Sequence, residues 1–520
     1  MSYPNSNRWA LALILSTATF AACSDDPVEN ADASVKADAA PVVNNDAAAR
    51  NDAAPANDAM PAGDDAAAGG VRYVATLSGA QENPTVRDSA AEGTFEATLS
   101  GTTLTYHLQH NVAGATAAHL HNAIAGENGP VAVGFPNGNA DQTGDLTLTA
   151  AQILELEAGR FYVNVHSPSH MGGEIRGQVL LPGEELRVAH LTAAEEVPAV
   201  TSAATGTAQF ILDRTTRKVR YSIVTTLTPS ALHIHRAIAG VAGPVVVGLV
   251  IAGGEATLPD LAAYDADETY INIHTAANAG GEIRGQILAP GTQLFAAHLT
   301  GGQETPPVNT TSEGRGQVTL NYARDEARIA VNHTATITAA HVHVAPGGAS
   351  GPVSIGLTNG ANIREQEAVT ATQAVQLERG LWYLNVHTAA NGGGEIRGQV
   401  IHPGEKLFTA IMNGQNEAPN PVVTNATGGA QLILSADRAT YRVEGVFTMV
   451  VATAAHVHTA PAGMAGPVTF GLTIVGERLT ASGAITPAQV TDLEAGNDYV
   501  NVHSAANGGG EIRGQLTVQQ

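Results

Sequence analysis

The sequence predicts an all-β protein made of four tandem antiparallel β-sandwich domains, each with one short helix. The chain has 520 residues, which is too long for a single hydrophobic core and suits about four domains. A string close to "NVHTAANGGGEIRGQV" occurs four times, and its histidines lie 108, 113 and 116 residues apart. Segments such as "GTFEATLSGTTLTYHL" alternate apolar and polar residues, which is the pattern of half-buried antiparallel strands.

The spacing of the repeated string is that of complete domains, because solenoid units are only about 20 to 50 residues long. We therefore expect four domains, over residues 71–184, 185–292, 293–405 and 406–520. Each should contain about seven short strands joined by glycine-rich turns. The short helix is clearest in "TPAQVTDLEAG", where Thr486 and Gln489 form a capping box around Pro487 at the first helical position. Gly496 is expected to end this helix.

The N-terminus has the features of a secretion signal. Residues 1–22 contain the apolar run "WALALILSTATFAA", which is too short to cross a bilayer comfortably and has the length of a signal peptide. The run ends at Cys23, the only cysteine, and "FAAC" resembles the lipobox of bacterial lipoproteins, in which this cysteine is lipidated. The alternative is an ordinary secretory signal that leaves a free thiol. Both predict an extracytoplasmic protein, and the lipobox predicts a lipoprotein anchored at the outer membrane or cell surface.

Residues 23–70 are predicted to be the lipidated cysteine and a disordered tether. From position 24 the segment is mostly Ala, Asp, Asn and Pro, with ten acidic and two basic residues. Such a composition cannot bury enough apolar surface to fold. As a flexible coil it would hold the domains roughly 40 Å from a membrane surface.

The charge of the chain excludes one class of partner. The formal net charge is -23, and only three lysines are present. Nucleic-acid binding requires clustered Lys or Arg that displace counterions, so no nucleic acid is expected as a partner. With one cysteine, the domains cannot be held together by intrachain disulfides and must rely on packing.

The repeated string itself predicts a hairpin. If its two strands pair antiparallel, Asn385 lies opposite Arg397 and Tyr383 opposite Gln399, with His387 next to Glu395 on the same face. Val386 and Ile396, among others, then point to the core on the other face. The other three copies give the same register.

A His-x-His segment precedes each hairpin, as in "AAHVHVAPGG". Alternation along a strand points both imidazoles to one side. If this strand neighbours the hairpin, three imidazoles and a carboxylate could converge on one spot. Neutral imidazole is a good ligand for zinc and copper, and three protein ligands can leave a fourth position open. The candidate metal ligands are His119, His121, His166, His233, His235, His274, His341, His343, His387, His456, His458 and His503.

A structural alternative fits the same residues. The side chains could form a polar ladder on an outer sheet face, with imidazole donating to Glu, and Glu and Arg forming an ion pair worth about 0 to 1 kcal/mol if exposed. The candidate ladder or supporting residues are Glu174, Arg176, Glu282, Arg284, Glu395, Arg397, Glu511 and Arg513. No nucleophile, general base and oxyanion donor occur together, so no catalytic residue is expected. The Glu of each Glu-x-Pro segment is interpreted as a strand-end charge, or alternatively as a further carboxylate of the same site: Glu82, Glu196, Glu304 and Glu417.

The order of these motifs resembles that of the CHRD domain, the module named after chordin. Glu-x-Pro comes first, then His-x-His before Gly-Pro-Val, and then "NVH" and "GGEIRGQ", four times over. The resemblance implies an extracellular β-sandwich, immunoglobulin-like or superoxide-dismutase-like, with no general molecular activity. Chordin's cysteine-rich growth-factor-binding modules have no counterpart in this sequence. "AHVHVAPGG" also resembles the His-x-His strand of copper/zinc superoxide dismutases, but those enzymes need more histidines per subunit, so dismutase activity is not expected.

Three functions therefore stand as hypotheses. The first is a non-enzymatic, lipid-anchored envelope protein whose four CHRD domains bind an extracellular or envelope ligand, because linked modules raise avidity. The second is a zinc- or copper-binding protein that uses the three-histidine sets, with redox chemistry as an extension. The third is a structural spacer.

Overall fold

The computed structural model describes residues 70–519. The predicted signal peptide, the predicted lipidation site Cys23 and all of the predicted tether except Gly70 lie outside the described residues. Within the described part, no helix is both long and apolar enough to cross a bilayer.

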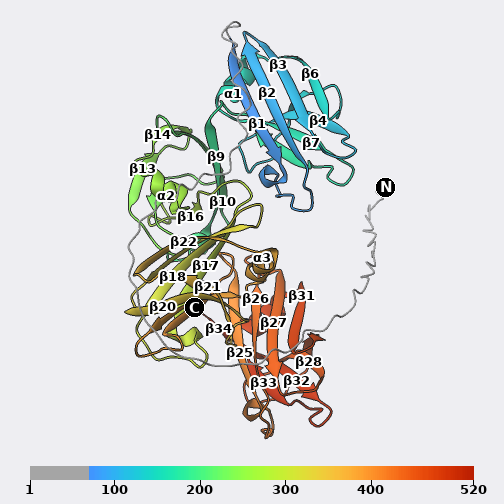
Figure 1. Ribbon diagram of the computed structural model, residues 1–520, viewed down its shortest axis with the longest axis vertical. Helices are drawn as coiled ribbons and strands as arrows, with labels where there is room; N and C mark the ends of the chain where they lie inside the picture. Colours follow the sequence, from blue (N-terminus) through green and yellow to red (C-terminus); the bar gives the residue numbers. More distant parts are fainter. Residues whose placement is uncertain (1–69, 520) are drawn as a thin grey trace, which may run out of the picture. The chain divides into compact units, whose positions relative to one another are not determined.

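The first repeat is an antiparallel eight-stranded sheet around one apolar core (Figure 1). The strand order is β5-β4-β7-β8-β1-β2-β3-β6, and all eight strands contribute side chains to the core. Its elements are β1 (Val71–Ser78), β2 (Glu92–Ser100), β3 (Thr103–His110), β4 (Ala117–Asn122), β5 (Val131–Gly134), β6 (Asp141–Thr147), α1 (Ala150–Glu157), β7 (Phe161–His166) and β8 (Ile175–Gln178).

Repeats 2 and 3 follow the same order, the sheet of repeat 4 adds β30 beside β31 and β34 beside β25, and each repeat has its own core. Repeat 2 contains β9 (Glu184–Thr192), β10 (Thr205–Asp213), β11 (Lys218–Thr225), β12 (Ala231–Arg236), β13 (Val245–Leu249), β14 (Gly254–Thr257), α2 (Leu261–Asp265), β15 (Thr269–His274) and β16 (Ile283–Gln286). Repeat 3 contains β17 (Gln293–Thr300), β18 (Glu313–Leu320), β19 (Glu326–His333), β20 (Ile337–Val344), β21 (Val353–Leu357), β22 (Asn362–Ala368), α3 (Ala371–Glu378), β23 (Trp382–Thr388) and β24 (Ile396–Gln399). Repeat 4 contains β25 (Lys406–Asn413), β26 (Thr427–Leu434), β27 (Thr440–Thr448), β28 (Ala452–Thr459), β29 (Val468–Gly471), β30 (Thr473–Val475), β31 (Arg478–Ala484), α4 (Pro487–Glu494), β32 (Asp498–Ser504), β33 (Ile512–Gln515) and β34 (Thr517–Val518).

The strands differ in how many of their faces are covered. In β2, Phe95 and its alternate neighbours face the core while the residues between them stay partly or fully exposed, as the alternation predicts. In β7, five of six residues are buried, including Asn164 and Tyr162 on the face away from the core. The outer face of β7 is therefore covered as well, and this covered face carries the repeated motif.

The predicted hairpin register is confirmed. In repeat 3, β23 pairs with β24 so that Tyr383 lies opposite Gln399 and Asn385 opposite Arg397. The same pairing holds in the other repeats. The Glu of "GGEIRGQ" precedes the second strand and is held there by its backbone, because the N–H of Glu395 donates to the carbonyl of Val386 at 2.8 Å.

The predicted helix in the last repeat is also confirmed. Thr486 caps α4, its side chain and that of Gln489 form the capping box, and Pro487 occupies the first turn. Gly496 follows in the left-handed region with φ of 73°, where glycine carries no steric penalty. Helices α1 and α3 have the same capping box, whereas α2 has only five residues and is capped by Asp260.

Candidate metal centre

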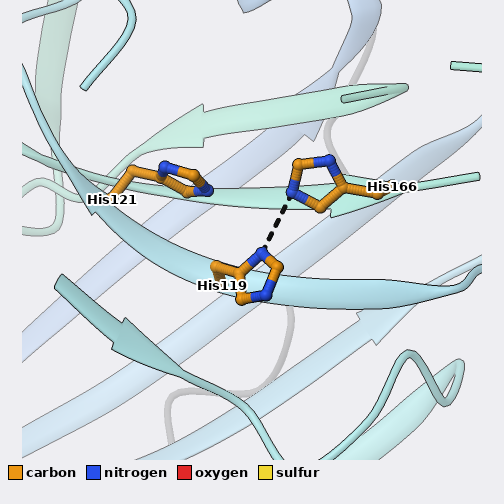
Figure 2. Close-up of side chains that lie close together, drawn as sticks. All are labelled: His119, His121 and His166. Carbon is orange, nitrogen blue, oxygen red and sulfur yellow. Dashed lines mark hydrogen bonds between the residues drawn. The ribbon is translucent and has the colours of Figure 1, made fainter. Parts of the chain in front are cut away.

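Three imidazoles converge in every repeat, as the sequence predicted. In repeat 1, β4 pairs with β7, which places His119 and His121 beside His166 at the end of the neighbouring strand (Figure 2). The Nδ1 of His119 lies 3.1 Å from the Nε2 of His166. Each of the three residues offers a nitrogen within 4.8 Å of the other two. The corresponding sets are His233, His235 and His274, then His341, His343 and His387, then His456, His458 and His503.

Backbone carbonyls fix the tautomer of two rings in each set. His121 Nδ1 lies 3.0 Å from the carbonyl oxygen of Gly129, and His166 Nδ1 lies 3.1 Å from that of Met171. A carbonyl can only accept, so both Nδ1 atoms carry the proton, and both Nε2 atoms present a lone pair. The equivalent carbonyls in the other repeats belong to Gly243 and Ala279, Gly351 and Gly392, and Gly466 and Gly508.

One of these lone pairs has no partner. The Nε2 of His121 is buried and makes no hydrogen bond within residues 70–519, and the same is true of His235, His343 and His458. A buried acceptor without a donor costs about 1 to 3 kcal/mol. The same unpaired atom, at the same place, occurs in four separate repeats.

The distances between ring nitrogens suit a shared ion. The Nδ1 of the first His-x-His histidine and the Nε2 of the hairpin histidine are 3.1, 3.2, 3.0 and 3.1 Å apart in the four repeats. Two nitrogens each about 2.0 to 2.1 Å from a tetrahedral zinc ion would be about 3.4 Å apart. The pair needs only a small separation and loss of the proton between the two rings to become two ligands.

Burial keeps the rings in the form that binds metal. Desolvation lowers the pKa of His121 and His166 from the ordinary value of 6.5. The same cause lowers the pKa of His343 and His387 in repeat 3. A metal must compete with protons for imidazole nitrogen, so a lowered pKa favours metal binding near neutral pH.

An aromatic side chain supports the second histidine of each His-x-His pair. The Tyr162 ring stacks on His121, with centroids 5.0 Å apart and planes inclined by 10°. The Tyr162 hydroxyl accepts a hydrogen bond from the N–H of Gly129 at 3.1 Å. The carbonyl of the same Gly129 fixes the tautomer of His121. Tyr270, Tyr383 and Tyr499 repeat both contacts. Sequence reasoning did not single out this tyrosine, although one stands at the same place in every repeat.

The predicted ladder arginines lie behind this tyrosine. The guanidinium of Arg176 covers the Tyr162 ring at 3.4 Å from its centroid and donates to the carbonyls of Glu127 and Ile124 at 2.8 and 3.0 Å. The side chain is fully buried. It therefore shapes the loop 123–130 that contains Gly129. Arg284, Arg397 and Arg513 stack on their tyrosines in the same way.

The predicted ladder glutamates contact hydroxyl groups and not the imidazoles of the three-histidine sets, although Glu174 also lies 3.6 Å from the ring of His170. Glu174 accepts from the Ser89 hydroxyl at 2.6 Å, and Glu282 and Glu511 accept from Ser202 and Thr424, both at 2.9 Å. Glu395 accepts from Thr310 and Thr388, and such bonds lower its pKa to about 2. Among the described residues no ion pair joins these glutamates to the neighbouring arginines. The glutamates instead hold the glycine-rich loop whose carbonyl fixes the hairpin histidine.

The glutamate of Glu-x-Pro is buried and is not an exposed strand-end charge. Glu304 is 6% exposed and accepts from the Asn385 side chain at 3.4 Å. Desolvation raises its pKa to about 7, against the opposing charge of Arg397. The carboxyl group belongs to no three-histidine set.

A further cavity lies among residues outside the histidine sets. It has a volume of about 790 Å³ and is lined by residues from all four repeats, including His190 and Glu195. Burial raises the pKa of Glu195 to about 8. None of the twelve candidate ligands lines this cavity. The histidine sets are the better candidate for a binding site than this cavity, because the same unpaired ring nitrogen occurs in all four repeats.

Comparison with solved structures gives only weak matches. Intact Ap-TbpB, with its N and C lobes, is 9% identical over 78% of this chain and 96% of its own, with a TM-score of 0.10. A single-substitution variant of the vaccine antigen Transferrin Binding Protein B from Haemophilus parasuis Hp5 is 8% identical over 78% of this chain and 94% of its own, also with a TM-score of 0.10. No curated protein matches the chain.

The family comparison agrees with the repeats seen in the structure. The model of the CHRD domain matches residues 73–179, 187–287, 295–400 and 408–516. Each matched segment contains one complete three-histidine set. The chain therefore belongs to the CHRD domain family and carries four copies of the domain in tandem.

Proposed function

We propose that the protein is a non-enzymatic, extracytoplasmic binding protein in which each CHRD repeat holds one zinc or copper ion. The observation that carries this proposal is the buried Nε2 of His121, His235, His343 and His458, which has no partner within residues 70–519. A metal ion bound there would satisfy the lone pair and draw on the two neighbouring rings.

The polar-ladder alternative explains less. A ladder would use the imidazoles as donors to glutamate, but the glutamates bond to serine and threonine hydroxyls. The hydrogen bond between His119 and His166 satisfies one pair of nitrogens and leaves the Nε2 of the third ring without a partner among the described residues. A structural role alone would not need three imidazoles aimed at one point.

The ligand set limits the metal and the chemistry. Three neutral imidazoles without a carboxylate suit zinc and copper better than calcium or magnesium, which prefer oxygen ligands. Three protein ligands leave a coordination position for water or for a group of a binding partner. The proposal therefore includes an extracellular or envelope ligand that binds through the metal or beside it.

We also propose the predicted organisation of the N-terminus. Residues 1–22 are the signal peptide, Cys23 is lipidated, and the tether over residues 23–70 holds the four domains, over residues 71–184, 185–292, 293–405 and 406–520, away from an outer-membrane or cell surface. Four linked sites on one tether would raise avidity for a repetitive ligand. Replacement of Cys23 by alanine should abolish incorporation of labelled fatty acid, and unchanged incorporation would reject the anchor.

Metal content tests the main proposal. The untagged chain, purified without chelators, should contain about four equivalents of zinc or copper by elemental analysis, one for each set. A variant with His341, His343 and His387 changed to Ala should lose one equivalent. The control is His107→Ala, since His107 belongs to no set and its partly exposed ring contacts Asp141. No bound metal after zinc and copper are supplied, or equal content in the triple variant, would refute the proposal.

A further inference from the structure

One glutamine joins repeat 2 to repeat 1. The side chain of Gln209, on β10, accepts a hydrogen bond from the N–H of Ala125 at 2.7 Å through its Oε1. Its Nε2 donates to the carbonyl of Gly159 at 3.1 Å. Gln209 is 1% exposed, so both bonds form away from water. Ala125 and Gly159 belong to the loop after β4 and the turn after α1 of the preceding repeat.

The same junction occurs twice more. Gln317 of repeat 3 accepts from Ala239 at 2.7 Å and donates to the carbonyl of Asp267 at 2.9 Å. Gln431 of repeat 4 accepts from Gly347 at 2.7 Å and donates to the carbonyl of Gly380 at 2.9 Å. Each glutamine is the fifth residue of its strand. Three internal junctions therefore use one chemistry, a side-chain amide that donates and accepts at once.

Within residues 70–519, no further repeat covers the equivalent face of repeat 4. Ala462 stands four residues after the second histidine of its His-x-His pair, as Ala125 does in repeat 1. Gly496 ends α4 as Gly159 ends α1. Ala462 is exposed and Gly496 partly exposed, whereas their counterparts in the other three repeats are buried. The backbone of Ala462 is therefore uncovered in repeat 4. The Gly496 carbonyl accepts from the Gln515 side chain at 2.8 Å, as the Gly159 carbonyl does from Gln178, and keeps one lone pair for a second donor.

The first repeat lacks the matching glutamine. The fifth residue of β2 is Glu96, which is not buried and pairs with Arg72 at 3.0 Å. An ionised carboxylate could accept from the Ala462 N–H but has no proton to donate to the Gly496 carbonyl, so two oxygens would face each other. Loss of that bond, with desolvation of a charge, opposes docking. Thr98, two residues after Glu96, would not prevent docking. The equivalent residue of repeat 3 is Thr319, which takes part in the junction with repeat 2 by donating to Asp267.

We propose that repeat 4 carries an open docking face, centred on the N–H of Ala462 and the carbonyl of Gly496, for the outer strand of another CHRD domain with glutamine at the Gln431 position. Glu96 prevents the first repeat of a second copy from filling this face. Repeat 4 therefore does not bind the first repeat of a second copy, because of Glu96. It can bind a CHRD domain that has glutamine at this position. This inference is independent of metal binding, since none of these residues belongs to a histidine set.

Glu96→Gln tests the proposal with the chain itself as the probe. At about 1 mM chain, the effective concentration that short linkers provide, the variant should associate head to tail. Small-angle X-ray scattering should then show an average mass at least twice that of the unchanged chain, which should remain monomeric. Glu92→Gln is the matched control, because it removes the same charge from an exposed residue of β2 outside the fifth position.

A second substitution identifies the face. Ala462→Pro removes the N–H donor, and proline suits this place because Pro461 to Met464 form a hydrogen-bonded turn with Gly463 at φ of 79°. The double variant Glu96→Gln, Ala462→Pro should return to the monomer mass while keeping the circular dichroism of the unchanged chain. Association of the unchanged chain, a monomeric Glu96→Gln variant, or association that survives Ala462→Pro would each overturn the proposal.

Discussion

His119 Nδ1 lies 3.1 Å from His166 Nε2, and the ring of His166 is held in this orientation by a hydrogen bond from its other nitrogen to the carbonyl of Met171. The two residues come from different strands, 47 positions apart in the sequence. Their contact, with the unpaired Nε2 of His121 beside it, makes a three-nitrogen site whose predicted behaviour can be measured.

Metal affinity should change little between pH 8 and 7 and should fall at lower pH. Each ligand must lose its proton to bind, and burial lowers the pKa of His343 and His387 below 6.5, so protons compete only at lower pH. Well below these pKa values the affinity should fall by about tenfold per pH unit for each protonated ligand. Competition with a chromophoric chelator at a series of pH values measures this. A decline that is already present between pH 8 and 7 would contradict the prediction.

Tyr383→Phe should weaken the site of repeat 3 without touching a ligand. Its hydroxyl accepts from the N–H of Gly351, whose carbonyl fixes His343. Loss of this bond leaves a half-buried N–H unsatisfied, at a cost of about 1 to 3 kcal/mol, and loosens the ring. Changes of this kind typically reduce metal affinity about 10- to 100-fold.

Tyr322→Phe is the control for that experiment, because the Tyr322 hydroxyl donates to the carbonyl of Val86 and lies outside the histidine set. Isothermal titration calorimetry in the background His119→Ala, His233→Ala, His456→Ala would report repeat 3 alone. Equal affinities for the two tyrosine variants would show that the Tyr383 hydroxyl does not support the site.

Gly394→Ala should destabilise repeat 3, whereas Gly393→Ala should not. Gly394 has φ of 138°, and a Cβ there would lie 2.5 Å from Glu304 Oε1 and 2.7 Å from Asn385 Oδ1. We expect a loss of about 1 to 3 kcal/mol in the free energy of unfolding, from the strained backbone alone. A Cβ on Gly393 would meet no atom within 4 Å, so its change should stay within about 0.5 kcal/mol.

Unfolding of repeat 3 can be followed separately. The sequence contains two tryptophans, and Trp382 on β23 is the one among the described residues. Its fluorescence in a chain that begins at residue 23 therefore reports urea unfolding of repeat 3. Equal midpoints for the two alanine variants would contradict the close approach at Gly394.

Glu304 should make repeat 3 less stable as pH rises towards 7. Burial raises the pKa of this carboxyl group from 4.5 to about 7 in the folded chain. A raised folded pKa contributes stability that is complete below about pH 4.5 and is lost as the pH rises through about 7, by an amount on the order of 1 to 3 kcal/mol.

Glu304→Gln should remove this dependence, since an amide resembles the neutral carboxyl group and does not ionise. Trp382 fluorescence during urea unfolding at pH 5 and pH 7.5 measures the difference. Glu367→Gln is a suitable control, because Glu367 lies on β22 and its partly exposed carboxylate forms no ion pair among the described residues. A variant whose stability falls between the two pH values as much as that of the unchanged chain would contradict the assigned burial effect.

The sequence by itself determined the features that depend on local periodicity. Alternation along the strands places Val386 and Ile396 on one face and Asn385 and Arg397 on the other, and the structure has this register. The His-x-His spacing fixes two rings on one side of β20, and the pairing of β20 with the hairpin adds the third. The capping box of α4 is likewise a contact between residues three positions apart. Such features are readable because strand and helix geometry relate neighbouring residues directly.

Only the tertiary structure decided the partners that come from distant segments. Glu395 could have faced His387, yet it turns to Thr310, which is 85 positions away, because that hydroxyl and the loop residues offer donors to a charged group. Arg397 is buried against the Tyr383 ring and is not exposed in a ladder. Its guanidinium donates hydrogen bonds to the carbonyls of Ala349 and Pro346 in another loop. Gln431 joins two repeats through backbone groups that no sequence pattern marks as binding sites. Backbone donors and acceptors are present at every residue, so only the fold determines which of them remain free to meet a given side chain.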